Sequence, residues 1–346
     1  MLLAWDRVVI PKFELGAAFL KNISFVNGSP VHKNHANKIR RSSTWTGQTA
    51  KALMDIYGRT PPDQLFKEKA NEIIRVTKIK GPPFDPHVYA EYLGIEVIQD
   101  KDAPFDGTLR MLTSGRFLIL LNASASEERK RFTLAHEIAH TFYYDDLKLH
   151  MERHCGAAIF DSEEERLCDI GAAELLMPSA YFGRDLKEGR KTEGSVTPQL
   201  IRTLALRYQV SMQATCVRTV SIIKSMACIY WSKSHSINSD WATPSKYRNL
   251  VICTTGKSSV ERAFRGQPSD TVIANDTYYG GGDRPMRRAT VSQKLGRDTV
   301  LSVIQPLGAR LKPSGSFTPS TQVDTSLCQP QVQYSLFSNR KIRVSP

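Results

Sequence analysis

The sequence lacks the cysteine pattern of a disulfide-stabilised or thiolate-zinc protein. No two of its six cysteines form a CxxC pair, and they are scattered along the chain: Cys155, Cys168, Cys216, Cys228, Cys253 and Cys328. This spacing argues against a disulfide framework and against a zinc cluster held by thiolates. We expect reduced thiols, most of which fill the core.

Long apolar runs are also missing. No stretch approaches the roughly 18 to 20 apolar residues that span a bilayer. Asp6, Lys12 and Glu14 interrupt the first twenty residues, so they lack the charge-then-apolar order of a secretion signal. We therefore expect a cytoplasmic protein without membrane contact, and 346 residues with 41% hydrophobic content are enough for two domains with cores of their own.

Acidic residues are scarce in the C-terminal part. Residues 201–346 hold 20 Lys or Arg against 7 Asp or Glu, a surplus that equals the net charge of +13 for the whole chain. Such asymmetry favours an acidic partner, nucleic acid included, and the run "RPMRRATVSQK" offers clustered cations for phosphate contacts. No nucleic-acid-binding motif is recognisable, so a solvated basic surface is the simpler interpretation.

The chain is predicted to have four parts and an α+β fold. Residues 1–45 show no sustained period and are expected to be a poorly ordered leader. Residues 46–224 predict a mainly helical domain with a small β-sheet, and residues 225–311 a smaller, basic, β-containing regulatory or docking region. The Pro-, Ser-, Thr- and Gln-rich residues 312–346 predict a flexible tail. Strand-like runs beyond residue 225 are "MACIYWS", "NLVICTT", "TVLSVIQPL" and "VQYSLF".

Local signals place a helix over the stretch "RFTLAHEIAHTFYYDD", residues 131–146. The runs "TLRML" and "RFLILLN" predict a hairpin that turns at Ser114-Gly115. Ser124, with Glu127 three residues later, has the spacing of a capping box and predicts the start of the helix. A second strong helix, "EEERLCDIGAAELLM", is predicted to end before Pro178.

The first helix carries the motif His136-Glu137-Ile138-Ala139-His140. Two histidines four residues apart lie on one helix face, about 6 Å apart along the axis, so both can bind one ion at about 2.0 to 2.1 Å. Glu137 then stands beside the ion, where a carboxylate can act as general base toward water. The HExxH motif predicts a catalytic Zn²⁺ site of the metalloprotease type, with a solvent-facing histidine pair as the competing interpretation.

A third ligand is not supplied by the motif itself. The pattern HExxHxxGxxH needs Gly at 143 and His at 146, where this chain has Tyr143 and Asp146. His150 and His154 are alternative ligands, although exposed loop histidines are the simpler interpretation. The hydroxyls of Tyr143 and Tyr144 lie within about 40° of the histidine face and are candidates to stabilise an oxyanion, with aromatic packing as the simpler role.

Helical phase separates three consecutive glutamates on the second helix. Glu165 shares a stripe with Asp169 and the small Ala172, where another helix can approach closely. Glu164 is turned about 100° from this stripe, and Glu163 points roughly the opposite way. We predict Glu165 as the third metal ligand and Asp169 as the acceptor that orients a histidine N–H.

Three blocks of the sequence resemble successive blocks of the ImmA/IrrE family of metallo-endopeptidases: "FDPHVYAEYLGIEVIQD", "RKRFTLAHEIAHTFYYD" and "EERLCDIGAAELLMP". The resemblance covers about residues 46–223 and implies His136, His140 and Glu165 as zinc ligands, with Glu137 as the general base. Asp169 stands where the family commonly has Asn. The resemblance also implies a helix-turn-helix repressor of the XRE type as substrate, and a role in transcription regulation and stress response.

The sequence therefore predicts a zinc-dependent endopeptidase that cleaves a regulatory protein and relieves repression. The alternative is a regulator that binds DNA or a repressor without proteolysis and uses zinc for stability. A structural zinc site usually has four ligands, and no fourth one is evident in the sequence.

Overall fold

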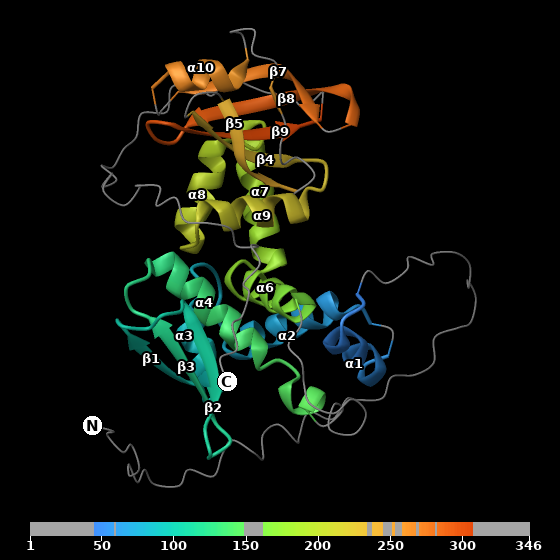
Figure 1. Ribbon diagram of the computed structural model, residues 1–346, viewed down its shortest axis with the longest axis vertical. Helices are drawn as coiled ribbons and strands as arrows, with labels where there is room; N and C mark the ends of the chain where they lie inside the picture. Colours follow the sequence, from blue (N-terminus) through green and yellow to red (C-terminus); the bar gives the residue numbers. More distant parts are fainter. Residues whose placement is uncertain are drawn as a thin grey trace, which may run out of the picture. The chain divides into compact units, whose positions relative to one another are not determined.

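The structure is a computed structural model (Figure 1). It describes residues 45–58, 60–148, 162–233, 237–244, 251–252, 258–267, 270–280 and 282–306. The predicted leader up to residue 44, the predicted tail, His150, His154 and the run "VQYSLF" lie outside these residues. None of the described helices combines the length and the apolar composition that a membrane crossing requires.

The chain divides into two compact units. Unit 1 consists of Met1–Thr77, Pro86–Ala125 and His136–Gly171, and unit 2 of Lys78–Asp85, Ser126–Ala135 and Ala172–Pro346, each over its described residues. The limit predicted at residue 224 falls inside unit 2, and the four-part division stays a prediction. The structure confirms the α+β class, because both units combine helices with a β-sheet.

Unit 1 contains a three-stranded sheet in the order β1-β3-β2. Strand β1 runs parallel to β3, and β2 runs antiparallel to it. The predicted hairpin is present, since the Leu112 N–H donates to the Arg116 carbonyl over 2.8 Å and Gly115 adopts the left-handed φ of 78° that such a turn needs. The elements of unit 1 before the long helices are α1 (Gln48–Ile56), α2 (Pro62–Val76), α3 (Pro86–Tyr92), β1 (Glu96–Asp100), β2 (Gly107–Met111) and β3 (Phe117–Asn122).

Helix α4 (Glu127–His140) begins two residues later than the predicted cap implies. Ser126, not Ser124, is the capping residue, because its Oγ accepts from the Arg129 N–H over 3.3 Å. Ser124 belongs to the preceding turn, where its N–H donates to Asn122 Oδ1 over 2.8 Å. The Asn122 side chain holds this turn, so the prediction of Ser124 as cap is wrong.

Helices α4 and α6 (Ser162–Leu176) approach each other closely at one point in unit 1. A Cβ placed on Gly171 of α6 would lie 3.0 Å from Ala139 Cβ and 3.2 Å from the rings of Phe142 and Phe66. Gly171 and Ala139 therefore let the two backbones come nearer than larger side chains would permit. This contact holds the N-terminal turns of α6 against the C-terminal turns of α4.

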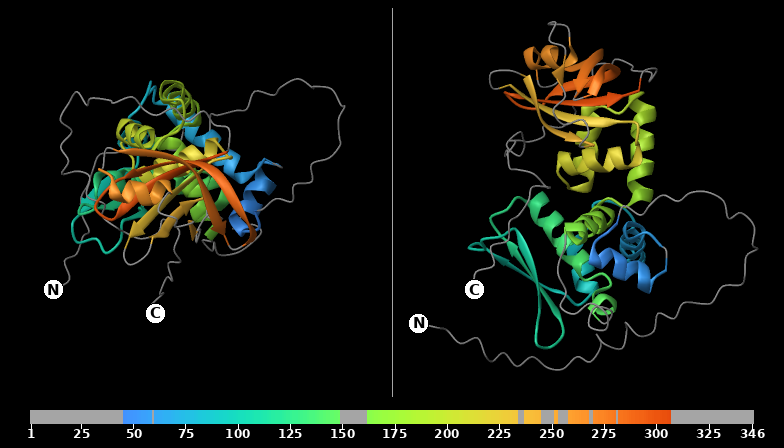
Figure 2. Two further views of the ribbon diagram at one scale, coloured as in Figure 1. Left: turned by 90° about the horizontal axis from the view of Figure 1, so that it is seen from above. Right: turned by 45° about the vertical axis from the view of Figure 1, so that its right-hand side comes forward.

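Unit 2 is built on a six-stranded antiparallel sheet in the order β5-β4-β9-β8-β7-β6. Helix α10 covers one face, where Phe264 packs with Trp231, and α8 and α9 lie on the other (Figures 1 and 2). Its other elements are α7 (Ser179–Glu193), α8 (Pro198–Tyr208), α9 (Met212–Ile222), β4 (Ala227–Lys233), β5 (Ile237–Thr243), β6 (Val251–Ile252), α10 (Ser259–Arg265), β7 (Thr271–Gly280), β8 (Gly282–Lys294) and β9 (Thr299–Gln305).

A buried ion pair ties α9 to the end of α6 within unit 2. The Arg218 guanidinium donates to the Glu174 carboxylate, which is fully buried, and to the Met177 carbonyl over 2.8 Å. The Ser179 N–H and hydroxyl donate to the same carboxylate over 2.8 and 2.9 Å. Burial by itself would raise the pKa of Glu174, but the Arg218 charge and the bonds from Ser179 lower it.

Gly171→Ala is expected to destabilise the protein, although Gly to Ala inside a helix normally stabilises by roughly 0.5–1 kcal/mol. The added methyl group crowds Ala139, and such overpacking costs about 1–3 kcal/mol. The matched control is Gly183→Ala in α7, where no heavy atom lies within 4 Å of an added Cβ, so this variant should gain stability. Denaturant unfolding of the full chain measures the stability of the two variants. An equal increase in the free energy of unfolding in both would contradict the tight contact at Gly171.

Arg218→Leu is expected to lower the free energy of unfolding by about 3–5 kcal/mol at pH 7, because it leaves a buried carboxylate without its cation. In the wild type, the lowered pKa of Glu174 makes the pair stabilising above the usual value of 4.5. That stabilisation disappears as the pH falls through the lowered pKa. In the variant, burial raises the pKa of Glu174, so the carboxylate takes up a proton as the pH falls. The difference in free energy of unfolding between the wild type and the variant should therefore become smaller at acid pH.

Unfolding with guanidinium chloride at pH 7 and at pH 5 gives the free energy of unfolding and tests this expectation. Glu127→Gln is the control, because it removes only the surface pair with Lys130, in which the Glu127 side chain is 79% exposed. Exposed pairs contribute less than about 1 kcal/mol. A comparable loss in the two variants would show that the Arg218 pair is no stronger than a surface pair.

Candidate metal centre

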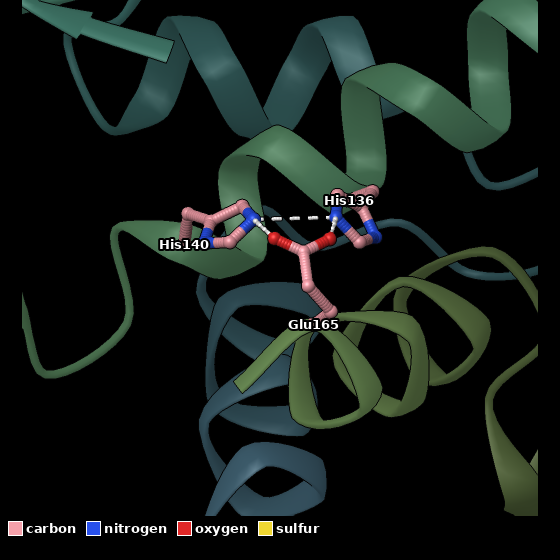
Figure 3. Close-up of side chains that lie close together, drawn as sticks. All are labelled: His136, His140 and Glu165. Carbon is pink, nitrogen blue, oxygen red and sulfur yellow. Dashed lines mark hydrogen bonds and ion pairs between the residues drawn. The ribbon is translucent and has the colours of Figure 1, made fainter. Parts of the chain in front are cut away.

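Helix α4 presents His136 and His140 side by side, as a spacing of four residues on a helix dictates. Their Nε2 atoms lie 3.2 Å apart, and both rings are largely buried (Figure 3). Both Nε2 atoms turn toward α6, so the pair is not a solvent-facing one. The two imidazoles therefore offer nitrogen donors to a shared point.

Glu165 supplies oxygen donors to the same point from the first turn of α6. Its Oε2 lies 3.3 Å from His136 Nε2 and its Oε1 lies 3.6 Å from His140 Nε2 (Figure 3). Ligands at about 2.0 to 2.1 Å in a tetrahedron are separated by about 3.3 Å, so these three spacings fit one tetrahedral ion. The Glu165 side chain is 59% exposed, which leaves one side of the donor set open. Within the described residues, this trio forms a group that could hold a metal ion.

Asp169 orients His136. Its Oδ1 lies 3.0 Å from His136 Nδ1, on the ring edge opposite the Nε2 that faces Glu165. Burial by itself would lower the pKa of His136, but hydrogen bonds to Asp169 and Glu165 outweigh it and raise the pKa to about 9. The carboxylates therefore stabilise a positive charge at this place, which a metal cation would provide in exchange for a proton.

Glu137 lies next to the donor set and is not part of it. Its half-buried carboxyl group accepts a hydrogen bond from the backbone N–H of Leu109 in β2. Burial raises its pKa, while the neighbouring His140 and His136 act in the opposite direction. A carboxylate whose pKa is raised above its usual value takes up a proton more readily and can return it. No sequence signal pointed to Leu109, because the group involved is a backbone amide of a kind that nearly every residue carries.

The two glutamates before Glu165 have different environments. Glu163 accepts hydrogen bonds from the backbone N–H groups of Thr46 and Gly47 at the start of α1. Glu164 places Oε1 3.5 Å from His140 Nδ1. From helical phase alone, Glu164 is expected to point away from the helix face that carries Glu165 and Asp169. The sequence therefore does not predict its contact with His140. The contact arises because His140 lies one turn further along α4 than His136, where the flank of α6 is in reach.

The tyrosines that follow the motif make packing contacts. The Tyr143 hydroxyl donates to the Leu65 carbonyl of α2 over 2.8 Å, and its ring packs against Tyr57. The Tyr144 ring meets Phe117 of β3 edge to face, with centroids 5.1 Å apart. We therefore assign the chemistry of the site without these two hydroxyls. The alternative ligands in the loop after α4 lie outside the described residues.

Comparison with known proteins places this centre in a known kind of domain. Residues 90–220 match the family model of the IrrE N-terminal-like domain. Two curated relatives are named radiation response metalloprotease IrrE. The one from Deinococcus deserti is 36% identical over 96 residues, and the one from Deinococcus radiodurans is 35% identical over 96 residues. Each alignment covers 27% of this chain, with 32% and 28% of the respective relative.

Among solved structures, a Mycobacterium tuberculosis transcriptional regulator aligns over 76% of this chain and 81% of its own, with 13% identity and a TM-score of 0.45. The matched segment 90–220 contains His136, Glu137, His140 and Glu165 together. The comparisons thus support an ImmA/IrrE-type metallopeptidase domain for this segment, which makes up less than half of the chain.

Proposed function

We propose that the protein is a zinc-dependent endopeptidase. The observation that carries the proposal is the triangle of His136, His140 and Glu165 donors with the Glu137 carboxylate beside it. Two imidazoles and one carboxylate are the donor set of catalytic zinc sites, in which an open position is kept for water or substrate. The match of residues 90–220 to the IrrE N-terminal-like domain and the names of the two relatives support the same activity.

The chain's own residues have separate roles in peptide hydrolysis. A zinc ion held by the three donors would polarise the scissile carbonyl and activate the attacking water as a Lewis acid. Glu137 takes the proton of that water and afterwards donates it to the leaving amine, and its raised pKa suits both directions of transfer. The Leu109 N–H fixes one orientation of this carboxylate. Asp169 fixes the His136 ring, so that Nε2 faces Glu165.

For the substrate, we propose a helix-turn-helix repressor of the XRE type, whose cleavage relieves repression. The sequence resemblance to the family supports this class, and the relatives' description as radiation response metalloproteases suits a regulatory target. The basic residues after 225 would then serve regulation or docking.

Direct DNA binding without proteolysis remains the competing function. Its strongest sequence feature, the run "RPMRRATVSQK", forms most of β8. The uncharged residues 289–293 of this run are buried in the sheet, whereas Arg287 is exposed and Arg288 and Lys294 are partly exposed. Glu137→Gln separates the two functions experimentally.

Glu165→Ala is expected to weaken zinc binding by more than about 100-fold, beyond the usual effect of losing a residue that only orients a ligand. The exposed Glu165 side chain makes the substitution mild for the fold. Competition with a chromophoric chelator measures the affinity of the full chain. Glu128→Gln, an exposed position on the first turn of α4, is the control and should bind like the wild type. Equal affinity of all three proteins would remove Glu165 from the metal site.

Glu137→Gln is expected to retain about one zinc ion per chain and to lower the rate of repressor cleavage by about 10²- to 10⁴-fold, since general base catalysis is lost. The assay follows cleavage of a helix-turn-helix repressor encoded beside this gene, with product masses determined by mass spectrometry. The Glu128→Gln control should cleave normally. Repressor or DNA binding that is unchanged by Glu137→Gln, with no cleavage by the wild type, would favour the non-proteolytic regulator.

A further inference from the structure

We propose that Thr49 and Glu164 are positioning residues for the metal ligand His140, so that helix α1 forms part of the metal centre. The inference rests on the proposed metal site and adds to it a second ligand-orienting carboxylate and the residue that holds this carboxylate. Thr49 lies outside residues 90–220, the segment matched by the family model.

The first step is the contact of Glu164 with His140. Glu164 Oε1 lies 3.5 Å from His140 Nδ1, and the two side chains are only 14% and 12% exposed. Asp169 faces His136 from the same ring position over the shorter distance of 3.0 Å, which is a hydrogen bond, whereas the Glu164 contact is an ion-pair distance. A carboxylate facing Nδ1 favours a proton on that nitrogen, which would leave Nε2 available as a metal donor and orient the ring.

The second step is the contact of Thr49 with the other oxygen of the same carboxylate. The Thr49 hydroxyl donates to Glu164 Oε2 over 2.8 Å, and Thr49 is 2% exposed. A buried hydroxyl at this distance restricts the rotation of the carboxyl group. Because Oε2 is engaged by Thr49, Oε1 is directed toward His140. The two oxygens of Glu164 thus link α1 to the metal ligand.

The third step is the attachment of α1 itself. Gly47, the residue before the helix, provides no side-chain cap. The Glu163 carboxylate takes this role from α6, accepting the N–H groups of Gly47 over 2.7 Å and of Thr46 over 2.9 Å. The Arg166 guanidinium lies 4.6 Å from the centre of the Trp45 ring, a cation–π distance. These contacts fix the first turn of α1, and with it Thr49, against the first turn of α6.

The three consecutive glutamates of α6 thus contact three different partners. Glu163 holds the start of α1, Glu164 is held by α1 and orients His140, and Glu165 faces the metal point. Their side chains leave the helix about 100° apart in succession, so adjacent residues reach different neighbours. The geometry makes α1 a support of His140 and not a separate helix that merely fills space.

The experiment uses the full chain and two measurements that need no substrate: zinc affinity by chelator competition, and the d–d absorption spectrum of the cobalt(II)-loaded protein. Glu164→Leu removes the acceptor and is expected to weaken zinc binding by about 10- to 100-fold and to change the cobalt spectrum. Thr49→Val should change both readouts in the same direction by a smaller factor. Thr49→Ser, which restores a hydroxyl, should return both toward the wild type.

Thr197→Val is the matched control. Thr197 also donates its hydroxyl to a glutamate, Glu193, but this pair lies at the start of α8 and contacts neither histidine of the motif. Its loss should lower stability and leave zinc affinity and the cobalt spectrum unchanged. A general loss of stability without any role in positioning would affect the Thr197 and Thr49 variants alike.

His140→Ala separates failure of this inference from failure of the proposed function. Unchanged zinc affinity and cobalt spectrum in Glu164→Leu, with metal lost from His140→Ala, would overturn the positioning role and leave the metal site intact. Full zinc affinity in His140→Ala would overturn both. Weakened binding in Glu164→Leu and Thr49→Val, recovery in Thr49→Ser and no effect in Thr197→Val would establish the inference, whether or not a repressor is cleaved.

Discussion

The contact between α4 and α6 at Gly171 and Ala139 is the constraint on which the candidate site depends. Neither helix carries the complete donor set, because α4 holds the two histidines and α6 holds Glu165. Glu165 comes within 3.3 and 3.6 Å of the two histidine nitrogens only if the two backbones approach closely. A glycine opposite an alanine permits this approach, and the surrounding rings of Phe66 and Phe142 fill the space beside it. Close packing of small residues thus makes the chemistry possible.

The charges around the three donors also favour a metal ion at this place. Carboxylates surround the two imidazoles, and each has a distinct position. Asp169 and Glu164 face the Nδ1 atoms, Glu165 faces the Nε2 atoms, and Glu137 stands beside them. Without a cation, burial would lower the pKa of His136, but Asp169, Glu165 and Glu137 raise it to about 9. A divalent ion would neutralise the negative charge, so the same charges that favour a metal ion also hold its ligands in the required orientation.

Much of the fold near the site follows from short-range sequence signals, and the exceptions have particular causes. The hairpin before α4 and both long helices are predicted correctly, because apolar periodicity and turn residues act over a few positions. The cap of α4 is misplaced because Ser124 and Ser126 both suit the role, and only the turn held by Asn122 decides between them. Strands β7 and β8 are not predicted because buried polar side chains interrupt their apolar pattern. Asp276 of β7 is only 4% exposed, and Thr290 and Ser292 of β8 are fully buried and bonded to Tyr278 and Ser302.

The sequence by itself determined the local geometry of the candidate site. The spacing of four puts His136 and His140 on one face of a helix, and helical phase puts Glu165 and Asp169 on one face of another, since both depend only on 3.6 residues per turn. The tertiary structure decided the rest. It brought Glu164 to His140, the Leu109 amide to Glu137 and Thr49 to Glu164. These contacts depend on how separate elements cross and on backbone groups that nearly every residue carries, and neither leaves a periodic trace in the sequence.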